Sequence, residues 1–267
     1  MAVRDEEIEQ YERDGVICLR QVFAPNWIEL LRQGVDRNLA DPSPYAKRYT
    51  PDGKPGLFLG DYCSWRRIPE YQEFLTHSPA AAIAGRFMRS KKVNLFHEHV
   101  LVKEPGTTEP TPWHHDLPYW SLDGMNAVSL WIPLDPIARA TSVEYVLGSH
   151  RWGKWYTPKR FNDSADHQTR EKFEPVPDID GERERYQLAG FEMAPGDCIL
   201  FHGLTLHGAP GNQSSNRRRA FAARFTGDDV KYALRDGYMS PPPESFPGAP
   251  IPGAAMDSAA FPVVWRA

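Results

Sequence analysis

The spacing of apolar residues changes near Lys91, and this change limits the possible folds more than any other feature of the sequence. Before Lys91 the apolar residues recur at helical intervals, whereas after it they alternate with polar ones, as they do in half-buried strands. Because helices precede strands and no βαβ alternation is present, we expect an antiparallel β core with flanking helices. Several strands at this spacing are typical of a sandwich or a jelly roll.

The predicted core consists of runs of β-forming residues separated by Gly, Pro and Asp. These runs are KVNLFHEHVLVKE, AVSLWIPL, TSVEYVLGS, GDCILFHGLTLHG and RRRAFAARFTG. A chain of 267 residues that is 41% hydrophobic can bury a full core, and all-β folds of this size often form one domain. We therefore expect a single domain over residues 1–267, with a helical part at about 1–90, a β core at about 91–230 and a proline-rich tail at about 236–267.

Helix signals are concentrated in the first third of the chain. Asp5 is the expected cap of a first helix over EEIEQYERDG, and Gly15 is its expected end. A short strand, VICLRQVF, follows, and a second helix should begin at about Pro25, because proline suits the first helical turn. A third helical region is predicted over PEYQEFLTHSPAAAIAGRFMRS.

Two segments have no regular pattern. Residues 157–185 are polar and highly charged, and an irregular insertion of this length in a compact domain is typically a functional lid or a mobile segment. The tail contains many of the 25 prolines of the chain, and we expect it to lie irregularly over the surface.

The overall charge argues against several classes of partner. A net charge of −4 gives no basic surface for phosphate backbones, so we expect no nucleic-acid partner. No apolar run approaches the roughly 20 residues that span a bilayer, and the acidic, polar start of the chain is unlike a secretory signal. These features predict a cytoplasmic protein without a membrane partner. Cys18, Cys63 and Cys198 have no CxxC spacing, so they are expected to be free thiols and not a disulfide or zinc framework.

The stretch PWHHDLPYW places two histidines and an aspartate in a row. In an extended strand, residues i and i+2 share a face, so His114 and Asp116 can converge on one point while His115 should point away. A distant strand run supplies two further histidines, His202 and His207. Two imidazoles and one carboxylate with open coordination positions form the 2-His-1-carboxylate site of non-haem Fe(II) oxygenases. Either distant histidine could supply the third ligand.

Taken together, several motifs resemble the phytanoyl-CoA dioxygenase family of Fe(II)/2-oxoglutarate-dependent oxygenases. The motifs, in chain order, are PWHHDLPYW, SLWIPLD, GSHRW, GDCILFHGLTLHGAPGN and RRRAFAARF. A lone HxD pattern would be weak evidence, but HxD together with the distal His and Arg block is specific. The match covers roughly 93–229 and implies a mainly β, cupin-like fold, the double-stranded β-helix or jelly roll, with iron in its open mouth.

Carried over to this sequence, the resemblance assigns the iron ligands to His114, Asp116 and His207, and thus favours His207 over His202. It implies that Arg218 binds the distal carboxylate of 2-oxoglutarate, with strand alternation sending Arg217 and Arg219 to the opposite face.

The resemblance also places Trp131 and His99 against the cosubstrate. In one respect the chain departs from the family: Ala209 stands where many members have a serine, which puts one hydroxyl contact to 2-oxoglutarate in doubt.

A charge count favours an arginine in the same cavity. Fe(II) with one carboxylate and two neutral imidazoles keeps about one positive charge, which dianionic 2-oxoglutarate turns into about one negative charge. One buried guanidinium restores neutrality and meets a carboxylate with two parallel hydrogen bonds.

The activity implied by the resemblance is hydroxylation of a C–H bond in a small organic molecule, with conversion of 2-oxoglutarate and O2 to succinate and CO2. Halogenating relatives lack the carboxylate ligand, so Asp116 argues against halogenation. The resemblance does not establish a CoA thioester as substrate. Substrate choice is expected to depend on the insertion at 157–185, on the loop at 119–125 and on the tail. The alternative prediction is a metal-binding jelly-roll protein without oxygenase activity.

Overall fold

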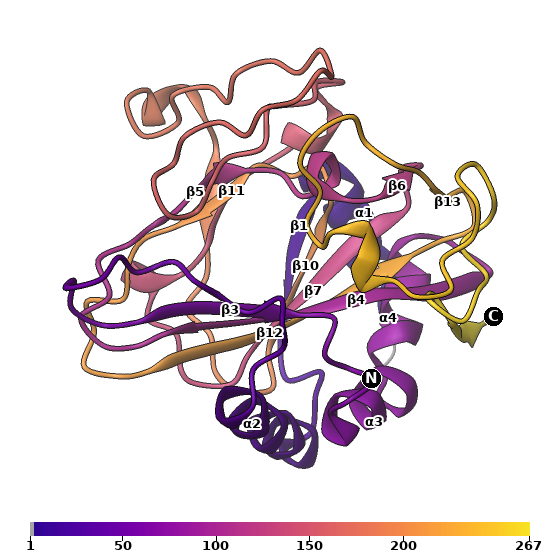
Figure 1. Ribbon diagram of the computed structural model, residues 1–267, viewed down its shortest axis with the longest axis horizontal. Coiled ribbons are helices and arrows are strands. Elements are labelled where there is room, and N and C mark those ends of the chain that lie inside the picture. Colours follow the sequence, from indigo (N-terminus) through magenta and orange to yellow (C-terminus); the bar gives the residue numbers. More distant parts are fainter. Residues whose placement is uncertain (1–2) are drawn as a thin grey trace.

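The computed structural model describes residues 3–267, and two facing β-sheets with helices on one outer side dominate it (Figure 1). The large sheet has the order β1-β10-β7-β12-β4-β3-β2, with β14 beside β4, and the small sheet has the order β5-β11-β8-β9. All pairs of strands in both sheets are antiparallel. The predicted fold class, a mainly β jelly roll with flanking helices, is confirmed.

The large sheet consists of β1 (Val16–Leu19), β2 (Lys47–Arg48), β3 (Phe58–Tyr62), β4 (Lys92–Lys103), β7 (Ala127–Pro133), β10 (Cys198–His202), β12 (Arg218–Thr226) and β14 (Val263–Arg266). The small sheet consists of β5 (Thr111–His114), β8 (Glu144–Val146), β9 (Leu188–Gly190) and β11 (His207–Ala209). A separate ribbon pairs β6 (Leu122–Asp123) with β13 (Lys231–Tyr232). The α-helices in the described residues are α1 (Asp5–Asp14), α2 (Pro25–Ala40), α3 (Pro69–His77) and α4 (Ala80–Phe87).

Successive side chains of β12 point to opposite faces of the large sheet. One set packs in the hydrophobic core under the helices, and the other faces the space between the two sheets. Phe221 and its alternate neighbours pack under the helices, where the Phe221 ring lies 4.8 Å from the ring of Tyr71 on α3. The intervening residues Ala220 and Ala222 face the small sheet and share a cluster with Tyr145 of β8. The helices therefore seal one face of the large sheet and leave the other face for a cavity.

The helical predictions are confirmed with two corrections. The first helix ends at Gly15, which has a left-handed φ of 76°, but its N-cap is Arg4 and not Asp5. The third region is two helices, α3 and α4, because Ser78 precedes a proline and adopts extended backbone angles (φ −75°, ψ 168°).

The predicted strand GDCILFHGLTLHG is in fact two strands in different sheets. β10 ends at His202, and the chain turns at Gly203 before β11 begins at His207. The alternating pattern continues across this turn, so periodicity alone could not reveal that the chain crosses between sheets.

The tail does not lie irregularly over the surface as predicted. Its last residues form β14, which pairs with β4, and Phe246, Met256 and Phe261 are buried in a cluster with Phe96. A proline-rich composition predicts irregular backbone, but it does not exclude burial of the aromatic residues between the prolines.

The predicted irregular insertion is confirmed as irregular, with isolated bridges and one short 3-10 turn, η4 (Arg183–Arg185). It connects β8 to β9 above the small sheet (Figure 1). Cys18, Cys63 and Cys198 are free thiols, as predicted. In the described part of the chain, no helix combines the length and apolar character needed to cross a bilayer.

Candidate metal centre

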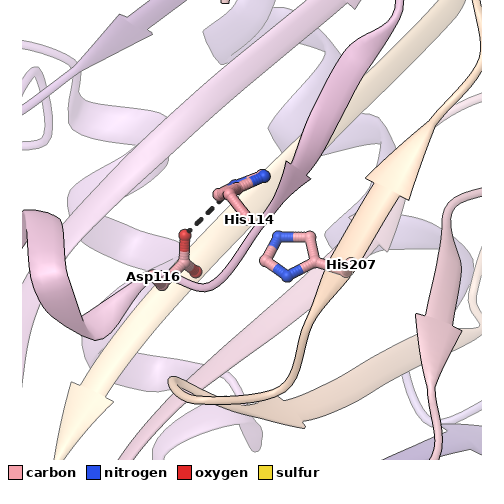
Figure 2. A group of neighbouring side chains, drawn as sticks. All are labelled: His114, Asp116 and His207. Atoms are coloured by element: carbon pink, nitrogen blue, oxygen red, sulfur yellow. Dashed lines mark ion pairs between the residues drawn. The ribbon is translucent and has the colours of Figure 1, made fainter. Parts of the chain in front are cut away.

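Three buried side chains, those of His114, Asp116 and His207, meet between the two sheets (Figure 2). One ligand atom from each lies within 4.8 Å of the others. His114 ends β5 and is the direct cross-strand partner of His207 on β11, so their rings are only 4.2 Å apart. Asp116 Oδ1 lies 3.7 Å from His114 Nε2. The structure thus brings together the three residues that the sequence singled out.

The reason for the convergence of His114 and Asp116 differs from the predicted one. β5 ends at His114, and Asp116 has helical backbone angles (φ −77°, ψ −39°) as the cap of the 3-10 turn η1 (Leu117–Tyr119). The two side chains therefore do not share one face of an extended strand. They meet because the chain turns back toward His114 immediately after the strand.

A backbone carbonyl orients the ring of each histidine through Nδ1, so that Nε2 points away from that carbonyl. His114 Nδ1 donates to the carbonyl of Pro112 at 2.7 Å, and His207 Nδ1 donates to the carbonyl of Thr205 at 2.9 Å. Because a carbonyl can only accept, each Nδ1 carries a proton, and Nε2 is the ring nitrogen left to face the cluster. Burial, together with His114, lowers the pKa of His207 to about 3, so this ring is neutral. Such orientation by a second hydrogen bond is typical of metal-binding histidines.

Asp116 is the anionic member of the cluster. Burial alone would raise its pKa, but the guanidinium of Arg224 and the side chain of His114 outweigh burial and hold the pKa below its ordinary value. Its Oδ2 is buried and has no hydrogen-bond partner. A buried, ionised oxygen that accepts no hydrogen bond from the described residues fits the role of a metal ligand.

The other two candidate histidines lie outside this cluster. His115 points away, as predicted, and its Nε2 accepts the backbone N–H of Tyr156 at 2.8 Å. His202 lies on β10, where Nδ1 accepts from Leu204 N at 3.0 Å and the ring lies 5.3 Å from that of His150.

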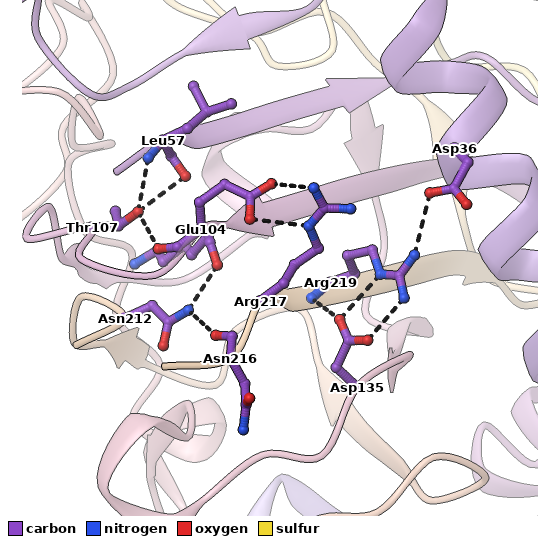
Figure 3. Close-up of polar contacts among 10 residues, drawn as sticks. Asp36, Leu57, Glu104, Thr107, Asp135, Asn212, Asn216, Arg217 and Arg219 are labelled. Carbon is purple, nitrogen blue, oxygen red and sulfur yellow. Dashed lines mark hydrogen bonds and ion pairs between the residues drawn. The ribbon is translucent and has the colours of Figure 1, made fainter. Parts of the chain in front are cut away.

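The three consecutive arginines separate as strand alternation predicted. Arg218 faces the interior and lines the same cavity as the histidines. Arg217 pairs with Glu104 at 2.7 Å, and Arg219 pairs with Asp135 at 2.9 Å and Asp36 at 3.3 Å on the outer side (Figure 3). The Arg217 side chain is 43% exposed, whereas that of Arg219 is only 13% exposed, so only Arg217 reaches solvent freely.

Arg218 is a buried cation without an acidic partner in the described residues. Its guanidinium donates to the carbonyl of Thr141, and burial lowers its pKa to about 10.

Lys103 on β4, the cross-strand partner of Arg218, is also buried and donates to the carbonyls of Glu109 and Pro210, each at 3.0 Å. Burial, and then Arg218, lower the pKa of Lys103 well below its usual range. The sequence analysis missed Lys103, although it ends the strand run that contains His99.

Trp131 and His99, predicted to lie beside a cosubstrate, both line this cavity. They are the two cross-strand partners of Ala222, one from each side of β12. His99 Nε2 is buried without a partner. Ala209 also lines the cavity, and directly opposite it on β5 stands Thr111, which lines the same cavity.

The cavity continues past the metal cluster to a wall of aromatic side chains. The insertion contributes Lys159, Phe161 and His167, and the tail contributes Tyr238. The Phe161 ring lies 4.8 Å from the ring of His114. The three segments expected to govern substrate choice therefore all reach the cavity, since the loop at 119–125 contributes Tyr119.

Arg224 is the second cavity residue that the sequence analysis missed. It is 8% exposed, and its Nη2 lies 3.7 Å from Asp116 Oδ2. A signal was present, since Arg224 stands six residues after Arg218 on the same strand run and therefore shares its face.

The sequence model of the family described as phytanoyl-CoA dioxygenase (PhyH) matches residues 11–220, well over half of the chain. The chain belongs to the phytanoyl-CoA dioxygenase family. Among curated proteins, this family member is 23% identical to peroxisomal phytanoyl-CoA dioxygenase of Rattus norvegicus, over 86% of this chain and 64% of the relative. It is also 23% identical to a probable phytanoyl-CoA dioxygenase of Caenorhabditis elegans, over 80% of this chain and 65% of the relative. It thus spans slightly less than two thirds of the length of these relatives.

Solved structures share the fold of this phytanoyl-CoA dioxygenase family member over almost its whole length. The non-haem alpha-ketoglutarate-dependent epimerase SnoN from nogalamycin biosynthesis superimposes with a TM-score of 0.74 at 20% identity, covering 98% of each chain. EctD from S. alaskensis, with 2-oxoglutarate and 5-hydroxyectoine, superimposes with a TM-score of 0.70 at 18% identity, covering 95% of this chain and 86% of the other.

Proposed function

We propose that the protein is a non-haem Fe(II)/2-oxoglutarate-dependent dioxygenase that hydroxylates a C–H bond of a small organic molecule. The observation that carries this proposal is the joint presence, in one buried cavity, of a His-Asp-His cluster and of Arg218, which has no acidic partner among the residues that the structure describes. Family membership supports it, as do the names of the solved structures, one of which is SnoN in complex with Fe3+ and alpha-ketoglutarate.

His114, Asp116 and His207 would hold the iron. Two neutral imidazoles and one carboxylate are the donor set that non-haem Fe(II) oxygenases use, and three protein ligands leave positions for cosubstrate and O2. Asp116 Oδ2, which has no hydrogen-bond partner in the described residues, and the two Nε2 atoms that face the cluster fit this role. The bound metal would supply the oxidising chemistry, in which 2-oxoglutarate and O2 give succinate, CO2 and one oxygen atom for the substrate. The carboxylate ligand argues against halogenation.

Arg218 would hold the distal carboxylate of 2-oxoglutarate, with Lys103 beside it. A planar guanidinium can form two parallel hydrogen bonds to a carboxylate and keeps its proton even when buried. Trp131 and His99 would flank the cosubstrate from the two strands next to β12. Thr111, opposite Ala209, would supply a hydroxyl group at the place where many family members have a serine.

The remaining task of the protein is to keep water out and to orient the substrate. Phe161 and Tyr119 both pack against the ring of His114, at 4.8 Å and 5.8 Å between ring centroids. Tyr119 also fixes the insertion, because its hydroxyl donates to the carbonyl of Lys159 at 2.9 Å. A dry cavity of this kind strengthens charge interactions and protects reactive species from side reactions.

The decisive experiment is anaerobic addition of 2-oxoglutarate to the Fe(II)-loaded protein, followed by exposure to O2. We expect a metal-to-ligand charge-transfer absorption band and then iron-dependent formation of succinate, which a screen of small metabolites should accelerate. A zinc-loaded sample is the matched control and should give neither signal. Metal binding without the band and without succinate would favour the alternative, a metal-binding jelly roll that lacks oxygenase activity.

Several wider assignments also belong to this proposal. We propose that residues 1–267 form a single catalytic domain, supported by the shared large sheet, which pairs strands from both ends of the chain. The lack of a nucleic-acid partner stays a prediction from the net charge, and a cytoplasmic location stays a prediction from the sequence. The relatives named for phytanoyl-CoA do not make a CoA thioester the substrate here, because sequence identity is 23%.

A further inference from the structure

A second arginine occupies the end of the cavity that lies opposite Arg218. Both residues lie on the inner face of β12, and only the small side chains of Ala220 and Ala222 separate them on that face. At about 3.3 Å per residue, their six-residue separation is roughly 20 Å along the strand. The cavity floor therefore has a cation at each end, and the proposed function uses only the one at Arg218.

The hydrogen-bonding capacity of Arg224 is largely unused. Nη1 lies 3.0 Å from His97 Nε2, and the guanidinium lies over the Trp120 ring at 5.3 Å. Nη2 lies 3.7 Å from Asp116 Oδ2, beyond the 2.7–2.9 Å of charge-assisted hydrogen bonds. Nε is buried and has no partner. Once Asp116 binds a metal, its negative charge is shared with that metal, and Arg224 lacks a full counter-ion.

Two neighbours add further unpaired polar atoms to this end of the cavity. His97 and Ser129 are the cross-strand partners of Arg224 on β4 and β7, so the three side chains form one row across the floor. Because His97 Nε2 accepts from Arg224, its Nδ1 carries the proton, and this atom and Ser129 Oγ are buried without partners. A row of buried donors without acceptors predicts a ligand that brings acceptor atoms.

The cavity charge points to the same class of ligand. With Fe(II) and 2-oxoglutarate in place, the metal, Asp116, the cosubstrate and Arg218 together are about neutral. Lys103, at the Arg218 end, is counted as neutral, because burial, and then Arg218, lower its pKa well below its usual range and its Nζ already donates to two backbone carbonyls. Arg224 then adds one positive charge to the buried space. The insertion contributes Lys159 to the cavity lining, but this side chain already has a counter-ion, because its Nζ lies 2.7 Å from Asp166 Oδ1. An uncompensated buried charge is costly, so a substrate with a negative group is favoured over a neutral one.

Beyond Arg224 the cavity wall is aromatic. Tyr119, Phe161 and Tyr238 line it, and His167 stacks on Tyr238 with ring centroids 3.6 Å apart. Such surfaces bind apolar and planar groups through area burial and stacking.

We propose that Arg224 is a substrate-binding residue, and that the primary substrate is a small carboxylate with an aromatic or otherwise unsaturated body. The carboxylate accepts hydrogen bonds from the Arg224, His97 and Ser129 row, and the body packs against Tyr119 and Phe161 beside the metal cluster. This assignment rests on the proposed function, because it takes Arg218 to be occupied by the cosubstrate.

The test compares two probes of the same shape and different charge, phenylacetate and phenylacetamide. Each is titrated calorimetrically and anaerobically into protein that is saturated with Fe(II) and 2-oxoglutarate. A hydrogen bond to a charged group corresponds to a change of about tenfold to a hundredfold in the dissociation constant, so we expect phenylacetate to bind at least about tenfold more tightly. Equal binding of both probes, or no binding of phenylacetate, would overturn the proposal.

Variants then test whether Arg224 is the residue that causes the preference for phenylacetate over phenylacetamide. Arg224→Gln should abolish the preference for phenylacetate, Arg224→Lys should restore part of it, and the outer-face variant Arg219→Gln should keep it unchanged. The comparison of the two probes on the unmodified protein stays decisive even if Arg224→Gln fails to fold. A variant that loses iron but keeps the preference would assign Arg224 to the positioning of Asp116, and would overturn its role in substrate binding.

The charge-transfer band separates this inference from the proposed function. If the band forms and phenylacetate leaves it in place, the cosubstrate stays bound and the preference reports on Arg224. If phenylacetate removes the band, the probe displaces 2-oxoglutarate and the assignment of Arg224 fails. If the band never forms, 2-oxoglutarate does not bind the metal. The proposed function is then wrong, whichever probe binds more tightly.

Discussion

At the scale of single residues, Arg217 and Arg218, adjacent at the start of β12, have different surroundings and therefore different expected roles. Arg218 is buried in the cavity, whereas Arg217 reaches solvent and pairs with Glu104. We expect Arg218→Ala to leave a carboxylate of 2-oxoglutarate unpaired in a desolvated site, a loss of about 2–5 kcal/mol. This corresponds to a rise of about 30-fold to several-thousand-fold in the 2-oxoglutarate dissociation constant, measured from the charge-transfer band.

Arg217→Ala is the matched control for this experiment. Because its ion pair is largely exposed, its loss should change stability by no more than about 0.5 kcal/mol and leave cosubstrate affinity unchanged. Iron should stay bound in both variants. An Arg218→Ala protein that titrates like the unmodified one would exclude the assigned role of Arg218.

The metal cluster allows a second prediction at this scale. Alanine at His114, Asp116 or His207 should abolish iron binding, because each substitution removes one of three ligands. His115→Ala and His202→Ala should retain iron, since both side chains have hydrogen-bond partners elsewhere. Metal analysis of the purified variants measures this. Stoichiometric iron in His207→Ala would show that the third ligand lies elsewhere.

Glu98 on β4 provides a prediction about pH. Burial raises the pKa of its carboxyl from 4.5 to about 8, so the folded protein retains a proton that the unfolded chain loses. The free energy of unfolding contributed by this group therefore decreases as pH rises from about 5 to about 8, by roughly 1 kcal/mol per pH unit.

Glu98→Gln removes this ionisation and keeps an oxygen to accept the N–H of Ser64. We expect the variant and the unmodified protein to have similar stability in urea near pH 5, and the variant to be more stable near pH 9. Parallel stability profiles of the two proteins across this range would contradict the raised pKa of Glu98.

At the scale of elements, the tail contributes core packing as well as a strand. Phe261 is fully buried against the rings of Phe96 and Phe246, 5.6 Å and 4.9 Å away. Phe261→Ala should destabilise the protein by about 3–5 kcal/mol, through lost burial and the cavity left behind. Ile251→Ala, at a tail position that is 78% exposed, should change stability by no more than about 0.5 kcal/mol. Equal stability of the two variants in urea would show that the tail only covers the surface.

At the scale of the whole molecule, the large sheet connects distant parts of the chain. β1 and β14 come from opposite ends of the sequence and pair with β10 and β4 of the same sheet. We therefore expect one cooperative thermal transition, with a calorimetric enthalpy equal to the van't Hoff enthalpy. Because Cys18, Cys63 and Cys198 are free, a reducing agent should leave the transition temperature unchanged. Two separate transitions would contradict the single-domain proposal.

The sequence by itself determined the fold class and the residues of the metal cluster. Helix signals before Lys91 and alternation after it depend on local spacing, which a single sequence displays directly. His114, Asp116, His207 and Arg218 were found because motif spacing and the family resemblance identify particular positions.

Only the tertiary structure decided which groups share the cavity with that cluster. Lys103 and Arg224 belong to strand runs that read as ordinary β-structure, and their burial follows from pairing with residues more than a hundred positions away. The burial of Phe261 and the approach of Phe161 to His114 likewise come from packing between distant segments. Local patterns cannot specify such contacts, because a strand's alternation tells which residues share a face but not what covers that face.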